Sequence, residues 1–154
     1  MDVLGFDPYV TDAAAAGLGI RPRSLPDLLA ESDFVTLHIP INAGTRHLLD
    51  AAAIAAMKPG ARLINCARGG LVDEAALAQA LESGHLAGAA LDVFEAEPPD
   101  PSGLVGMPGV IATPHLGAST REAQIRVAAE ICEKVKDYLL EGKARDAVNP
   151  VPKS

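Results

Sequence analysis

The chain has 154 residues, 49% of them hydrophobic, and a formal net charge of -7 from 13 basic and 20 acidic side chains. This length and composition are typical of a globular domain with a sizeable core, and they exclude a disordered chain. The negative charge argues against binding to nucleic acid or to an anionic membrane surface, and no apolar run reaches the roughly 20 residues of a membrane-spanning helix.

The N-terminal segment, MDVLGFDPYV, has neither the basic region nor the apolar core of a signal peptide. The two cysteines, Cys66 and Cys132, do not form a CxxC pair, which favours a reduced, cytoplasmic protein. The histidines are too scattered to suggest a metal site; they are His38, His47, His85 and His115.

The first half of the chain contains two apolar runs that predict strands, residues 2–7 (DVLGFD) and 33–40 (DFVTLHIP). Residues 24–32 (SLPDLLAES) predict a helix, because Ser24 can cap its N-terminus and Pro26 is tolerated in the first turn. Residues 50–57 (DAAAIAAM) are helical by composition, and KPG ends that helix.

The second half repeats the alternation. Three further runs predict strands: 61–67 (ARLINCA), 86–94 (LAGAALDVF) and 108–115 (PGVIATPH). Asp73 and Gly84 delimit a helix over 73–84, and Ser119 with Glu122 gives a capping-box signature for a long helix over 119–142. Residues 95–109, rich in Pro and Gly, form a linker, and 143–154 form an extended exit.

Strands that alternate with helices and are apolar throughout are typical of a parallel sheet with helices on both sides. The predicted fold class is therefore α/β, a doubly wound parallel sheet. In such sheets ligands bind outside the carboxyl ends of the strands.

Five polar side chains lie at or just after the ends of five predicted strands; they are Asp7, His38, Arg68, Asp92 and His115. Each one alone has an ordinary explanation as a turn cap or a solvated residue. Core packing does not require all five, so their convergence predicts a binding edge. Two glycines follow Arg68, and they allow a sharp turn or a close approach of the backbone.

Three motifs resemble the signature blocks of the D-isomer-specific 2-hydroxyacid dehydrogenases: INCARGGLVDEAAL, GAALDVFEAEP and TPHLGAST. The resemblance extends from GFDPY to VNP, and FDPY, HLGASTREAQ and AVNP are most similar to one branch of the family. It implies a Rossmann-like sheet and an NAD-dependent oxidoreductase that interconverts a D-2-hydroxy acid and its 2-keto acid.

The family pattern also implies three catalytic residues. Arg68 matches the arginine that binds the substrate carboxylate and keto oxygen, for which a rigid two-pronged cation is suited. His115 matches the proton donor and acceptor, and Glu97 matches the carboxylate that supports the charged imidazole.

Contacts to NAD follow from the same resemblance. Asp7 matches the acid that binds the adenosine ribose, and because PYVTD contains no Arg, NAD is favoured over NADP. Asp92 matches a residue near the nicotinamide amide. Further cofactor-lining positions are Ile39, Cys66, Ala67, Leu116, Gly117 and Ala118.

The chain departs from the family in one respect, because the phosphate-binding motif G-x-G-x-x-G is absent. GLGI at 17–20 follows a helical stretch and is better interpreted as the end of that helix. We therefore expect an incomplete sheet without the first strand and its Gly-rich loop. Residues 1–145 would form a partial NAD-binding domain that by itself binds NAD weakly or not at all, and residues 146–154 would form an exit segment.

Two alternatives remain open. One is a non-catalytic module of the same fold that senses NAD or binds a protein. The other is a different 2-hydroxyacid reductase, acting for example on glyoxylate or hydroxypyruvate. Whether the protein is the dehydrogenase or the other reductase, its partners would be a small 2-hydroxy or 2-keto acid and further copies of the chain in a homo-oligomer.

Overall fold

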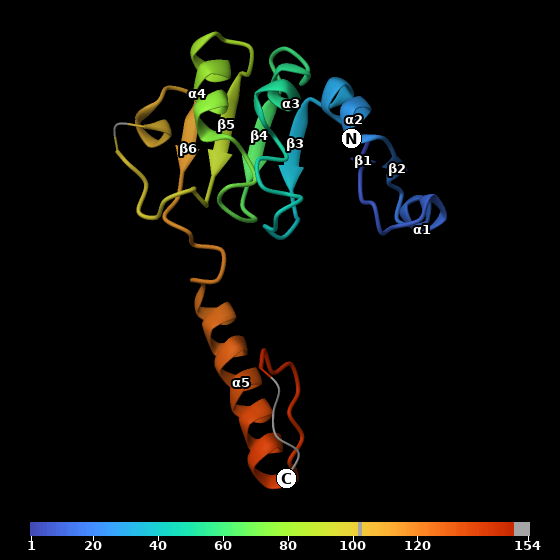
Figure 1. Ribbon diagram of the computed structural model, residues 1–154, viewed down its shortest axis with the longest axis vertical. Coiled ribbons are helices and arrows are strands. Elements are labelled where there is room, and N and C mark those ends of the chain that lie inside the picture. Colours follow the sequence, from blue (N-terminus) through green and yellow to red (C-terminus); the bar gives the residue numbers. More distant parts are fainter. Residues whose placement is uncertain (102, 150–154) are drawn as a thin grey trace. The chain divides into compact units, whose positions relative to one another are not determined.

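The computed structural model describes residues 1–101 and 103–149, and it divides the chain into two compact units (Figure 1). The first unit is Met1–Pro114 and the second begins at His115.

The first unit contains a parallel four-stranded sheet with the order β3-β4-β5-β6. The strands are β3 (Phe34–Leu37), β4 (Arg62–Asn65), β5 (Gly88–Leu91) and β6 (Val110–Ala112). This confirms the α/β class and the neighbouring parallel strands predicted from the four apolar runs.

Three helices pack against this sheet: α2 (Leu25–Glu31), α3 (Ala51–Ala55) and α4 (Glu74–Glu82). Their N-caps are Ser24, Asp50 and Asp73, whose side chains each accept a hydrogen bond from the backbone N–H three residues later. Gly84, with φ 72°, follows the end of α4, as the sequence predicts.

The hydrophobic core lies on one face of the sheet. Val35, Leu63 and Ala89 are in register across β3, β4 and β5, and they join Ile54 of α3 and Leu77 of α4 in a single buried cluster. The other face of the described sheet has exposed apolar side chains, with Phe34 57% and Ile111 69% accessible. Among the described residues of the first unit, the helices therefore cover one face, although the uniformly apolar strands predicted helices on both.

A second, two-stranded parallel sheet pairs β1 (Leu4–Gly5) with β2 (Arg21–Pro22), and α1 (Asp12–Gly17) connects them. The expectation that residues 2–7 would share an edge with the other predicted strands is wrong, because β1 pairs with β2 instead. Gly19, at φ 74°, follows α1, so GLGI lies at a helix end as predicted.

The second unit is built on α5 (Arg121–Glu141), which ends at Gly142 in the left-handed conformation. Its N-cap is Thr120, whose hydroxyl accepts from the Ala123 N–H at 3.2 Å, so the predicted capping box at Ser119 is wrong. Residues 143–149 contain neither helix nor strand, and the rest of the expected exit segment, 150–154, lies outside the described residues. Across the described ranges, no helix is both long and apolar enough to cross a membrane.

Candidate active site at the carboxyl ends of the strands

Arg68 stands on a turn that a buried amide builds. Asn65, the last residue of β4, is 2% exposed. Its Oδ1 accepts from the Ala67 N–H at 3.1 Å, and its Nδ2 donates to the Arg68 carbonyl at 3.0 Å. The Arg68 side chain is exposed, and Nη1 donates to the Ala67 carbonyl at 2.6 Å. The turn therefore presents a guanidinium to solvent from a backbone that the core holds in place.

Replacing Asn65 with alanine should lower the free energy of unfolding by about 1–3 kcal/mol, because two partly buried backbone groups lose their partners. Urea denaturation measures this loss. Ser83→Ala is the control, since the Ser83 hydroxyl donates to the Ala80 carbonyl at the far end of α4. An Asn65→Ala protein as stable as Ser83→Ala would mean that the amide does not build the turn.

The two glycines after Arg68 bring neighbouring loops into contact. A Cβ on Gly69 would lie 1.8 Å from the Phe94 carbonyl oxygen, so the turn after β4 touches the backbone that follows β5. Gly70 has φ 76°, and its carbonyl accepts from the His47 N–H at 2.8 Å. The glycines, which the sequence associates with close approach, are thus packed between two other loops.

Asp92 and Glu97 follow β5. Asp92 is 6% exposed; its backbone N–H donates to the Asn65 carbonyl at 3.0 Å, and its carboxylate accepts from the Thr113 hydroxyl after β6. Glu97 is exposed, and its Oε1 accepts from the Phe94 N–H at 3.2 Å, which folds residues 94–97 back on themselves. The peptide bond between Glu97 and Pro98 is cis.

Three proposed cofactor positions also follow β3 or β4. Ile39 is half-buried against the core two residues after β3, Cys66 is exposed, and Ala67 is half-buried. The structure therefore brings these positions, Arg68, Asp92 and Glu97 to the carboxyl-end side of one sheet. Their roles in binding and catalysis stay predictions.

Asp7 belongs to a different part of the first unit. It follows β1, is exposed, and its Oδ1 accepts from the Tyr9 N–H at 2.8 Å. Because β1 is not hydrogen-bonded to the four-stranded sheet, the idea that five strands of one sheet deliver five polar groups is wrong for Asp7.

His115, Leu116, Gly117 and Ala118 open the second unit. All four are exposed, His115 has φ 54°, and the Leu116 carbonyl accepts from the Ser119 N–H at 2.9 Å. The predicted proton transfer by His115 stays a prediction.

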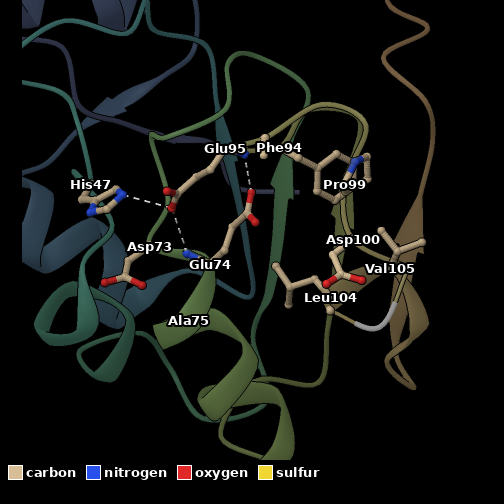
Figure 2. Close-up of a pocket in the computed structure, with 12 residues that line it drawn as sticks. His47, Asp73, Glu74, Ala75, Phe94, Glu95, Pro99, Asp100, Leu104 and Val105 are labelled. Atoms are coloured by element: carbon tan, nitrogen blue, oxygen red, sulfur yellow. Dashed lines mark hydrogen bonds and ion pairs between the residues drawn. The ribbon is translucent and has the colours of Figure 1, made fainter.

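The structure also reveals a cluster that the sequence did not indicate, made of His47, Glu74 and Glu95 (Figure 2). Nε2 of His47 lies 3.0 Å from Oε1 of Glu95, and the Glu95 N–H donates to Oε1 of Glu74 at 2.6 Å. Burial of Glu74, reinforced by the Glu95 carboxylate, raises the pKa of Glu74, although the Glu95 N–H and His47 act in the opposite direction. The three residues come from distant segments, so no spacing in the sequence links them.

This cluster borders an open cavity of about 400 Å³, which is also lined by Asp73, Phe94, Pro99, Asp100 and Leu104. The residues that line it do not include Arg68 or Glu97. The cavity is therefore distinct from the predicted substrate site, although Ala96 and Pro99, which flank the Glu97–Pro98 pair, line it.

Residues 1–117 match the family model described as D-isomer specific 2-hydroxyacid dehydrogenase, NAD binding domain. The chain is 51% identical over 149 residues to a D-3-phosphoglycerate dehydrogenase of Bacillus subtilis, covering 97% of this chain and 28% of that protein. A D-3-phosphoglycerate dehydrogenase of Methanocaldococcus jannaschii is 43% identical, with 97% of this chain and 29% of that protein covered.

The fold is also similar to that of solved D-2-hydroxyacid dehydrogenase structures. The holo form of D-mandelate dehydrogenase from Rhodotorula graminis superposes with a TM-score of 0.86 at 37% identity, covering 93% of this chain and 42% of that one. The chain spans less than a third of the length of the two curated relatives named above. The resemblance inferred from the three motifs is confirmed: the chain belongs to the D-isomer specific 2-hydroxyacid dehydrogenase family, and residues 1–117 match the NAD-binding domain of that family.

Proposed function

We propose that this chain forms part of an NAD-dependent dehydrogenase that oxidises D-3-phosphoglycerate at C2 and reduces the corresponding 2-keto acid in the reverse direction. The carrying observation is the Arg68 turn, an exposed guanidinium held by the buried Asn65 amide and packed against the loop of Glu97. The relatives at about half identity, which are named D-3-phosphoglycerate dehydrogenase, support this choice of substrate.

Arg68 would bind the carboxylate of the 2-keto acid with two parallel hydrogen bonds and leave the keto oxygen beside the same cation. A planar guanidinium suits this geometry, and its charge would stabilise the oxygen as negative charge develops there. The fixed turn would limit the motion of the guanidinium and so place the substrate in one orientation.

His115 and Glu97 would move the proton. In reduction, the imidazolium of His115 would donate a proton to the keto oxygen, and in oxidation the neutral ring would accept it from the hydroxyl. The role proposed for Glu97 is that of a carboxylate which stabilises the charged ring.

The described residues offer suitable contacts for NAD, which when bound would accept the hydride from C2. Asp7 is an exposed carboxylate after β1 that can accept from ribose hydroxyls. Ile39 and Ala67 offer apolar surface, and Asp92 a carboxylate, after the strands of the main sheet. The remaining proposed contacts are Cys66, Leu116, Gly117 and Ala118.

We further propose that the protein is cytoplasmic and homo-oligomeric and does not bind nucleic acid. Both cysteines are free, which suits a reducing compartment. The net charge of -7 would repel nucleic acid.

The direct test is the oxidation of NADH by the complete protein with a panel of 2-keto acids. We expect the highest kcat/KM with the keto acid derived from D-3-phosphoglycerate, and lower values with hydroxypyruvate and glyoxylate. A preference for glyoxylate would instead favour the reductase alternative, for which a glyoxylate reductase structure at 35% identity is a precedent. No reduction of any keto acid, with NADH bound, would favour the non-catalytic module.

Replacing Arg68 with lysine should impair both KM and kcat for the keto acid. Lysine keeps the charge but loses the two-pronged geometry. The loss of one hydrogen bond to a charged group should lower kcat/KM by about ten- to hundredfold. Arg62→Lys is the matched control, since Arg62 lies at the opposite end of β4 and stacks over the Phe34 ring at 5.6 Å. Equal kinetics for the two variants would contradict the role of Arg68.

A further inference from the structure

Three loops meet where the strands of the main sheet end. The segment that follows β3 returns through His47, whose backbone N–H donates to the Gly70 carbonyl at 2.8 Å. Gly69 in turn lies so close to the Phe94 carbonyl that there is no room for a Cβ. The position of Glu97 relative to the Arg68 turn therefore depends on how residues 94–97 are held.

Glu95 is held both through its side chain and through its backbone N–H group. Its Oε1 accepts from Nε2 of His47 at 3.0 Å, and the Glu74 N–H at the start of α4 makes a longer contact of 3.4 Å with the same oxygen. Its backbone N–H donates to Oε1 of Glu74 at 2.6 Å. Figure 2 shows these contacts joining the loop after β3, the start of α4 and the loop after β5.

The position of the hydrogen between His47 and Glu95 follows from which of the two groups can donate. An ionised Glu95 carboxylate can only accept, so Nε2 of His47 must carry the hydrogen of their shared bond. The side chains of His47 and Glu95 are 35% and 33% exposed, so their hydrogen bond is partly shielded from water. Such a contact restrains a loop more firmly than the more exposed pair of Lys58 and Asp33, whose side chains are 48% and 73% exposed.

We propose that Glu95 is a positioning residue, which holds residues 94–97 through His47 and Glu74 and thereby fixes the Glu97 carboxylate beside the Arg68 turn. This inference rests on the proposed function for its catalytic meaning. Glu95 lines the neighbouring cavity, whose lining does not include Arg68 or Glu97, so it acts through the loop and not on the substrate.

The test compares Glu95→Ala and Glu95→Gln in the complete protein. We expect Glu95→Ala to lower kcat for keto-acid reduction by up to about a hundredfold, the effect of a misplacement of roughly 1 Å. Glu95→Gln should recover most of this loss, because its amide oxygen can still accept from His47 and from the Glu74 N–H.

The comparison of kcat with NADH affinity separates positioning from loss of stability. If Glu97 is displaced from the Arg68 turn, kcat at saturating keto acid should fall in Glu95→Ala while the affinity for NADH changes little. Glu97→Gln is the reference variant, since it removes the carboxylate itself. A Glu95→Ala protein with the wild-type kcat would overturn the proposal.

Amide hydrogen exchange gives a second readout that does not depend on activity. The amides of residues 94–97 should exchange about ten- to hundredfold faster in Glu95→Ala, as expected for losing hydrogen bonds to charged groups. Asp33→Ala is the matched control, because it breaks the Lys58–Asp33 ion pair at the amino-terminal end of β3. Equal exchange of 94–97 in Glu95→Ala and Asp33→Ala would overturn the proposal even if the protein proves to be a dehydrogenase. A wild-type protein that reduces no keto acid would instead overturn the proposed function, while the exchange comparison would still decide whether Glu95 holds the loop.

Discussion

Replacing His115 with alanine is expected to lower kcat for keto-acid reduction by about a hundred- to ten-thousand-fold, the range typical of general acid–base catalysis. The variant removes the proposed proton donor and leaves Arg68 and the strand-end contacts in place. We therefore expect the affinity for NADH to change little. Stopped-flow or steady-state reduction of the keto acid measures the first effect, and fluorescence titration with NADH measures the second.

His85→Ala provides the control for this experiment. The His85 ring lies in the first unit, before β5, with Nε2 3.2 Å from the Ile54 carbonyl oxygen. Its loss should affect stability and leave kcat of the folded protein close to the wild type. If His115→Ala reduces the keto acid at the wild-type rate, His115 is not the proton donor.

Replacing Gly69 with alanine is expected to damage both stability and activity. The new Cβ would lie 1.8 Å from the Phe94 carbonyl oxygen and 2.5 Å from the carbonyl carbon. Backbone atoms cannot rotate away as a flexible side chain does, so the Arg68 turn and the Glu97 loop must separate. The free energy of unfolding should fall by about 3 kcal/mol or more, at or beyond the upper end for overpacking.

The same separation should reduce kcat/KM by about a hundredfold in the molecules that remain folded, since it displaces two proposed catalytic groups relative to each other. Denaturant unfolding and keto-acid reduction measure the two effects. Gly17→Ala is the matched control, because a Cβ there meets nothing within 4 Å and the residue has no positive φ. Identical unfolding midpoints for Gly69→Ala and Gly17→Ala would show that the two loops are not in contact.

The sequence by itself determined the four main parallel strands and most helix ends. Runs such as 61–67 and 86–94 are apolar because they cross the core. Ser24 and Asp73 accept hydrogen bonds from backbone N–H groups at helix starts, and Gly84 follows the end of a helix with a positive φ. These signals act over a few residues, so they can be interpreted without knowing the fold. The motifs around Arg68, Glu97 and His115 also indicated the family, which the match over residues 1–117 confirms.

Local signals were insufficient where either of two neighbouring residues could cap the same helix. Ser119 and Thr120 both carry a hydroxyl that can cap a helix, and the structure uses Thr120, because α5 begins at Arg121. Strand β2 was missed for a related reason, since Arg21–Pro22 is short, polar and contains a proline. Its ladder tolerates Pro22 because the donors are the N–H groups of Arg21 and Arg23 on either side.

The tertiary structure decided which segments meet. Only the fold places β1 beside β2 and removes Asp7 from the edge of the main sheet, and only the fold brings Gly69 against Phe94. His47, Glu74 and Glu95 are separated by 27 and 21 residues along the chain, and each alone looks like an ordinary surface residue. Contacts between such distant positions depend on strand order and loop paths, which are set by the packing of the whole unit and not by the local sequence.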